Sequence, residues 1–142
     1  MPGFCFYHPI EVRYGDLDPQ GHLNNAKYLT YFEQTRLQYL LHLGLFAKEQ
    51  SFTDIGIILA EVKVTFLAPV HFGTAVKVGV CVSRLGNKSM ISEYTLRDSA
   101  TDQELATGSA VLVAFDYRAE KTIPIPHEWR EKITAFEGLA EA

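Results

Sequence analysis

Two carboxylates, an imidazole and several turn residues crowd the segment that leads into the longest helical pattern of the chain, YGDLDPQGHLNNAKY. A helix start leaves its first amides without intrahelical partners and carries a partial positive charge, so it can hold a developing oxyanion. Asn24 is a suitable N-cap, which leaves the N–H of Asn25 free at the first helical position. Asp18 precedes that amide, and His22 lies between the two. A carboxylate, an imidazole and an oxyanion donor at this spacing indicate acyl-transfer chemistry.

The same residue types also build ordinary turns. Aspartate, glycine, proline and asparagine are what a tight connection into a capped helix uses. Asp16 is therefore interpreted as a turn or packing residue. The fixed spacing of the whole string favours a functional role for Asp18, and it supports His22 less strongly than Asp18.

The string from Gly15 to Asn25, followed by Tyr28, resembles the active-site segment of the 4-hydroxybenzoyl-CoA thioesterase family of hot-dog-fold proteins. The shared pattern is two aspartates, then Gly-His, a hydrophobic residue and two asparagines. The resemblance implies that Asp18 acts on a thioester carbonyl, as nucleophile or as general base, and that the Asn25 amide is the oxyanion donor. His22 matches a position that is histidine in some members and apolar in others, so its role is the least specific of the three.

A basic turn between two predicted strands, RLGNKS, is the best candidate for holding the phosphates of a carrier. Its glycine lets backbone amides approach an anion, and Arg84 and Lys88 supply positive charge. On its own a basic β-turn is usually a solvated hairpin tip. The resemblance implies carrier binding at this turn, with Lys88 and Ser89 matching best. Lys63 and His71 are further candidates that the sequence does not place.

The composition of the chain is that of an ordinary globular domain. It has 142 residues, 47% hydrophobic and 21% charged, with a formal net charge of −4. This charge argues against a general nucleic-acid or anionic-membrane surface. No secretory signal or membrane-length apolar run is present, so a cytoplasmic protein is expected. Cys5 and Cys81 have no metal-like spacing and are expected to be reduced thiols.

The length of the chain predicts a single domain over residues 1–142. Strand patterns cover residues 4–14, 57–66, 75–85, 89–98 and 104–116, a long helix covers residues 25–43, and a short terminal helix covers residues 127–136. No βαβ alternation occurs, so the prediction is an α+β fold in which an antiparallel sheet of about five strands wraps around one long central helix. This order of elements matches the hot-dog fold.

The resemblance also implies a substrate and an assembly. We expect an acyl-CoA thioesterase that needs no cofactor and no metal, and a homodimer or homotetramer with sites between subunits. A sheet covered by a helix on one face only is compatible with such association. Tyr28, Phe32 and the strand from Ile57 are expected to line the acyl pocket. Polar residues of the long helix are interpreted as solvent or subunit contacts: Glu33, Gln34, Arg36 and Gln38. Glu33 is kept as a minor catalytic alternative.

Two other functions stay open at this point. A hot-dog hydratase adds water to an enoyl thioester with an aspartate and a histidine in an Asp-x-Asn-Pro-x-His string. In DLDPQGH an aspartate replaces the asparagine, and one extra residue precedes the histidine, which shifts the imidazole relative to the carboxylate. A non-catalytic acyl-thioester-binding domain would not require the set of Asp18, His22 and Asn25.

Overall fold

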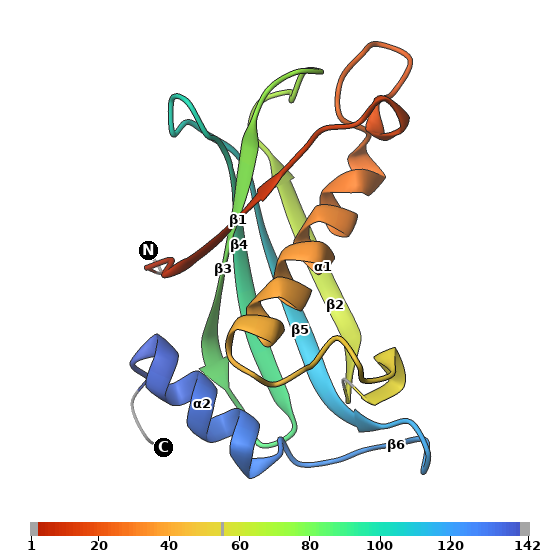
Figure 1. Ribbon diagram of the computed structural model, residues 1–142, viewed down its shortest axis with the longest axis vertical. Coiled ribbons are helices and arrows are strands. Elements are labelled where there is room, and N and C mark those ends of the chain that lie inside the picture. The colour runs from red at the N-terminus through yellow and green to blue at the C-terminus, as the bar shows by residue number, and fades with distance from the viewer. Residues whose placement is uncertain (1–2, 55, 140–142) are drawn as a thin grey trace.

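The computed structural model describes residues 3–54 and 56–139, which form a curled antiparallel sheet with a long helix across one face (Figure 1). The elements are β1 (Phe6–Ile10), α1 (Asn25–His42), β2 (Ile57–Phe66), β3 (Val76–Leu85), β4 (Ser89–Asp98), β5 (Glu104–Asp116), β6 (Lys121–Thr122) and α2 (His127–Glu137), with 3-10 turns at Tyr14–Asp16 and Phe52–Asp54. The strand order is β1-β3-β4-β5-β2, and β6 pairs with β5. This is the predicted hot-dog architecture.

The long helix α1 has well-defined ends. The Asn24 side chain accepts a hydrogen bond from the Ala26 amide at 3.0 Å, which is the predicted N-cap. At the other end Gly44 adopts a φ of 73°, and the Leu45 N–H returns to the Leu40 carbonyl at 2.9 Å. A glycine in the left-handed region with this return bond is the usual helix stop. The start of α1 is therefore fixed beside the motif loop, residues 14–24.

The core lies between α1 and the inner face of the sheet. The inward residues of β3 are all buried, as their alternation predicted: Val76, Val78, Val80 and Val82. Phe32 of α1 stacks on Tyr94 of β4 with ring centroids 4.7 Å apart. The helix can approach this closely because Gly108 of β5 has no side chain, since a Cβ there would lie 2.5 Å from the Phe32 ring. Close packing at this point holds α1 against the middle of the sheet.

The inner face of β2 is less well covered than that of β3. Leu59 and Phe66 pair with Leu112 and Ala106, which are buried, so all four side chains lie on the same inner side. Nevertheless Leu59 is 42% exposed and Phe66 is 49% exposed. The helix packs mainly against β1 and β3. The helix therefore leaves part of the inner face of β2, an edge strand of the sheet, uncovered.

Several boundaries differ from the sequence prediction. β1 ends at Ile10, because the next residues turn into the 3-10 segment that places Asp16 inside the protein. The short strand β6 was not predicted. The terminal helix forms as expected and ends at Gly138, whose φ is 68°. In the part of the chain that is described, no helix is long and apolar enough to cross a bilayer.

Candidate active site

Asp16 is a structural residue, as its local sequence indicated. It is 1% exposed and accepts a hydrogen bond from the Tyr31 hydroxyl at 2.7 Å. The Arg13 guanidinium lies 3.1 Å from its Oδ1 atom, and Lys27 lies at 3.9 Å. Burial opposes ionisation of this carboxyl, but the hydrogen bonds from Arg13 and Tyr31 outweigh it and hold its pKa below the ordinary value. Asp16 ties the loop to the side of α1.

Asp18 is held differently, because only one of its two oxygens is occupied. Its Oδ1 atom accepts hydrogen bonds from the backbone amides of Gln20, at 2.9 Å, and His22, at 3.0 Å. Gly21, with a φ of 81°, permits the tight turn that brings these amides back. Among the described residues Oδ2 has no hydrogen-bond partner. The carboxylate is thus oriented by the loop and keeps one free oxygen.

The Asn25 amide is unpaired at the first position of α1. The N-cap side chain of Asn24 takes the Ala26 amide, and the Asn24 carbonyl takes the Lys27 amide at 2.9 Å. Within the described chain no hydrogen bond is made by the Asn25 N–H. This amide therefore meets the geometric requirement for an oxyanion donor at a helix start.

Asp18 and Asn25 line one cavity of about 290 Å³ at the start of α1. His22 and Tyr28 also line it, and its opposite wall is the segment from Phe66 to Pro69 at the end of β2. Tyr28 is buried and touches Phe66 edge-on, with ring centroids 4.9 Å apart. Burial, and next the charge of Asp18, raise the pKa of Tyr28, so its hydroxyl stays protonated beside the carboxylate. Four of the predicted site residues are therefore brought together.

His71 is a neighbour of the site that the sequence could not place. Its ring centroid lies 4.8 Å from that of His22, with the planes at 81°. The two residues form an isolated β-bridge, and the adjacent Leu23 amide donates to the Val70 carbonyl at 2.7 Å. Because this pairing joins segments far apart in the chain, no local pattern signals it. It fixes the backbone of the motif loop against the segment that follows β2.

The predicted carrier-binding turn lies at the other end of the sheet. Arg84, Lys88 and Ser89 lie at the β3–β4 turn, beside α2, whose Arg130 donates to the Gly86 carbonyl at 2.7 Å. Lys88 reaches Thr122 of β6 at 3.5 Å. A strand as long as β4 spans about 33 Å, which separates this turn from the motif loop (Figure 1). Within one chain these cations do not join Asp18.

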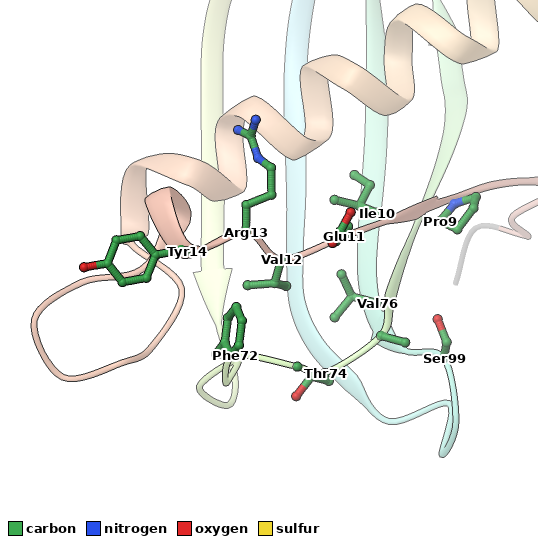
Figure 2. Close-up of a pocket in the computed structure, with 12 residues that line it drawn as sticks. Pro9, Ile10, Glu11, Val12, Arg13, Tyr14, Phe72, Thr74, Val76 and Ser99 are labelled. Carbon is green, nitrogen blue, oxygen red and sulfur yellow. The ribbon is translucent and has the colours of Figure 1, made fainter.

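A larger cavity, of about 730 Å³, lies elsewhere (Figure 2). It lies between the segment that follows β1 and the loop before β3, and Val12 and Phe72 are among its lining residues. Arg13, the cation at its rim, is already bound to Asp16. The residues drawn there include no nucleophile beside an unpaired helix amide. In the described residues no group of three or more histidine, cysteine or acidic side chains is placed to hold a metal ion.

Comparisons with known proteins agree on one family. The profile of the thioesterase-like superfamily matches residues 12–133. The long-chain acyl-CoA thioesterase FadM of Escherichia coli is 24% identical over 124 residues, which cover 87% of this chain and 93% of that protein. YsmA of Bacillus subtilis, an uncharacterised protein, is 25% identical over 130 residues, covering 92% of this chain and 86% of that one.

Solved structures extend the likeness to the whole chain. A thioesterase of Thermus thermophilus, crystallised with coenzyme A and Zn, has a TM-score of 0.84 and is 32% identical, covering 99% of this chain and 100% of that one. A member of the thioesterase superfamily from Jannaschia has a TM-score of 0.85 at 27% identity, covering 98% of this chain and 87% of that one. This chain belongs to the thioesterase-like superfamily, and it is a thioester hydrolase on the predicted hot-dog fold.

Proposed function

We propose that this enzyme hydrolyses acyl-CoA thioesters in the cavity at the start of α1, with Asp18 as the acting carboxylate. One observation carries the proposal: the carboxylate with a free oxygen and the unpaired Asn25 amide line the same cavity. The Escherichia coli relative is named as a long-chain acyl-CoA thioesterase, and the Thermus structure contains coenzyme A. Both names support coenzyme A as the carrier.

The reaction needs a nucleophile, a polarised carbonyl and a leaving thiol. With the thioester carbonyl oxygen on the Asn25 amide, the free Oδ2 of Asp18 either attacks the carbonyl carbon or removes a proton from an attacking water. In the first route the C–S bond breaks, coenzyme A leaves as thiolate and takes a proton, and water then hydrolyses the anhydride to regenerate Asp18. One oxyanion donor contributes about 10²–10³ in rate. Tyr28 supplies a neutral hydroxyl beside the carboxylate.

A second copy of the chain would reconcile the site with the distant basic turn. β2 is an edge strand of ten residues, and Ile58 and Leu59 on it are 40% and 42% exposed. An exposed apolar edge is suited to pairing with an identical edge. Antiparallel pairing of two β2 strands brings the far end of the partner beside Asp18. The turn with Arg84, Lys88 and Ser89 would then hold coenzyme A at the site of the other subunit, in a homodimer or homotetramer.

The decisive experiment is a thiol-release assay over short, long and aromatic acyl-CoA substrates, with crotonyl-CoA included. We expect thiol release from at least one saturated acyl-CoA by the wild-type protein and its loss in the Asp18→Asn variant. Loss of the enoyl absorbance of crotonyl-CoA without thiol release would instead show a hydratase. Binding of acyl-CoA with no turnover of any substrate would show a non-catalytic binding domain.

A further inference from the structure

A second cavity beside α1 is lined by one cationic and one acidic side chain, Arg36 and Glu33. This cavity, of about 400 Å³, lies between the middle of α1 and the start of β2. Leu37, Leu40 and Ile57 give it apolar walls, and Arg36 is its cation. Ile57, at one end of β2, lines this cavity, and Phe66, at the other end, lines the cavity with Asp18. The two cavities therefore lie at the two ends of β2.

Arg36 is anchored by buried hydroxyl groups and not by a carboxylate. Its Nη1 atom donates to the Tyr94 hydroxyl at 2.7 Å, and that oxygen lies 2.8 Å from the Ser92 hydroxyl. Tyr94 is 2% exposed and Ser92 is 1% exposed, so the anchor is part of the core. Tyr94 is itself fixed by stacking on Phe32. The guanidinium is therefore held in one position, which lowers the entropy cost of binding a ligand to it.

The other edge of the Arg36 guanidinium is free. Among the described residues its Nε and Nη2 atoms have no hydrogen-bond acceptor, and no carboxylate lies within 4.0 Å. In that part of the chain, Arg97 Nε is the one buried side-chain nitrogen or oxygen that lacks a hydrogen-bond partner. The unpaired Nε and Nη2 atoms of Arg36 are therefore not buried, and a ligand can reach them. Glu33 lines the same cavity but is exposed and forms no ion pair there. A pair of parallel N–H groups is the arrangement that binds a carboxylate with two hydrogen bonds.

We propose that Arg36 binds a carboxylate at the far end of the acyl group, so that the preferred substrates are coenzyme A half-thioesters of dicarboxylic acids. This inference rests on the proposed hydrolysis at Asp18. Asn25 and Arg36 are eleven residues apart in one helix, a rise of about 16 Å. A polymethylene chain of medium length spans that distance and is apolar, like the wall that β2 provides. The charge at its end then meets Arg36, the cation among the described residues that line this cavity.

The test compares two substrates with equal numbers of carbons, sebacoyl-CoA and decanoyl-CoA. In the wild-type protein we expect kcat/KM to be higher for sebacoyl-CoA. Arg36→Gln should lower kcat/KM for sebacoyl-CoA by about 10-fold to 100-fold and change decanoyl-CoA by less than about 3-fold. Tyr94→Phe removes the anchor and should give a smaller loss with the same selectivity. Arg118→Gln removes an equal charge from an exposed turn and should leave both substrates unchanged.

Equal loss for both substrates in Arg36→Gln, or a matching loss in Arg118→Gln, would overturn the proposal. Calorimetric binding of both intact thioesters to Asp18→Asn, with and without Arg36→Gln, separates this site from the reaction. If the wild type releases no thiol but sebacoyl-CoA binding still depends on Arg36, the proposed function fails and the carboxylate site stands. If hydrolysis occurs and neither binding nor kcat/KM depends on Arg36, the site fails alone. Thermal unfolding of each variant excludes misfolding as the cause.

Discussion

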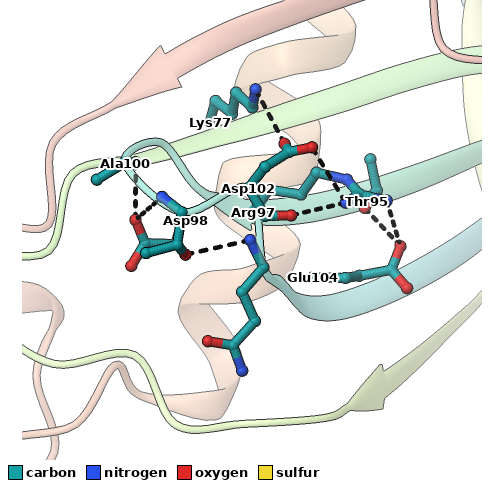
Figure 3. A network of polar contacts seen from close by, with 9 residues as sticks. Lys77, Thr95, Arg97, Asp98, Ala100, Asp102 and Glu104 are labelled. Carbon is teal, nitrogen blue, oxygen red and sulfur yellow. Dashed lines mark hydrogen bonds and ion pairs between the residues drawn. The ribbon is translucent and has the colours of Figure 1, made fainter.

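Two turns rich in acidic residues lie at the same end of the molecule, and they differ in whether a carboxylate lines a cavity with an unpaired helix amide. In the β4–β5 turn the acidic side chains form hydrogen bonds and ion pairs with neighbouring residues (Figure 3). Asp98 accepts from the Ala100 amide at 2.8 Å, and Asp102 pairs with Lys77 at 3.2 Å. Glu104 accepts from the Thr95 hydroxyl at 2.7 Å. These contacts all stabilise the hairpin.

The motif loop begins in the same way and then departs. Both carboxylate oxygens of Asp16 are bound, by Arg13 and by Tyr31. Asp18 instead lines a cavity that also contains an unpaired amide, and one of its oxygens has no partner among the described residues. Both turns contain aspartate, and in both an aspartate oxygen accepts hydrogen bonds from backbone amides of the same turn. Asp98 also bonds through only one of its oxygens. What distinguishes Asp18, the carboxylate proposed to react, is that it lines a cavity together with an unpaired helix amide.

The largest expected difference between the turns is in activity. Asp18→Asn keeps an oxygen for the amides of Gln20 and His22 but removes the charge. We expect thiol release from a good acyl-CoA substrate to fall by about 10³-fold or more, with an unchanged unfolding transition. Asp98→Asn in the other turn is the matched control and should stay within about 2-fold. Equal activity of wild type and Asp18→Asn would refute the assignment of this carboxylate.

Asp16→Asn should show the opposite behaviour, a loss of stability. The substitution removes a buried negative charge that faces Arg13 and the Tyr31 hydroxyl. We expect a decrease of about 2 kcal/mol in the free energy of unfolding, measured by urea titration. Tyr31→Phe removes a single hydrogen bond and should cost about 1 kcal/mol. If Asp16→Asn is as stable as the wild type, the buried contacts of Asp16 do not hold the loop.

Stability should also depend on pH through Asp16. Its pKa in the folded protein is below the ordinary value of 3.8, so its contribution is complete above the unfolded pKa and is lost as the pH falls through the folded one. The difference in unfolding free energy between wild type and Asp16→Asn should therefore be constant from about pH 7 to about pH 5 and shrink below about pH 4. A difference that stays constant down to about pH 2 would exclude this origin.

The smallest effect is expected for the exposed pair of the β4–β5 turn. Asp102, which is 66% exposed, pairs with Lys77 and has a φ of 62°, a conformation that asparagine also tolerates. Asp102→Asn should therefore lower stability by no more than about 0.5 kcal/mol, and added salt should abolish the difference. A loss that persists at high salt would show that the pair is not a screened surface interaction.

The sequence predicted those features that depend on neighbours along the chain. The ends of α1 follow from the Asn24 cap and from Gly44, and β2, β4 and β5 have the predicted bounds because their alternation is uninterrupted. The first strand was predicted too long, since contacts of Arg13 with Asp16 override the alternation after Ile10.

Features set by packing between distant segments were not predictable. His71 reaches His22 only through an isolated bridge. Arg36 was interpreted as a surface or subunit residue, because a helical pattern cannot show that Tyr94, on a strand, comes within 2.7 Å of it. The separation of Arg84 from Asp18 likewise follows from sheet topology, which the order of elements in the chain does not reveal.

Gly108 connects the architecture of the sheet with the depth at which α1 lies on it. Because Phe32 rests almost directly on the backbone at this position, the helix settles deeper than a methyl group would allow. Any larger residue there would push the whole of α1 away from the sheet, and Asn25 and Arg36 would move with it. Gly108 thus sets the distance between α1 and the sheet, and with it the room for a bound acyl chain. It does so from the core, because it lines neither of the two cavities between that helix and β2.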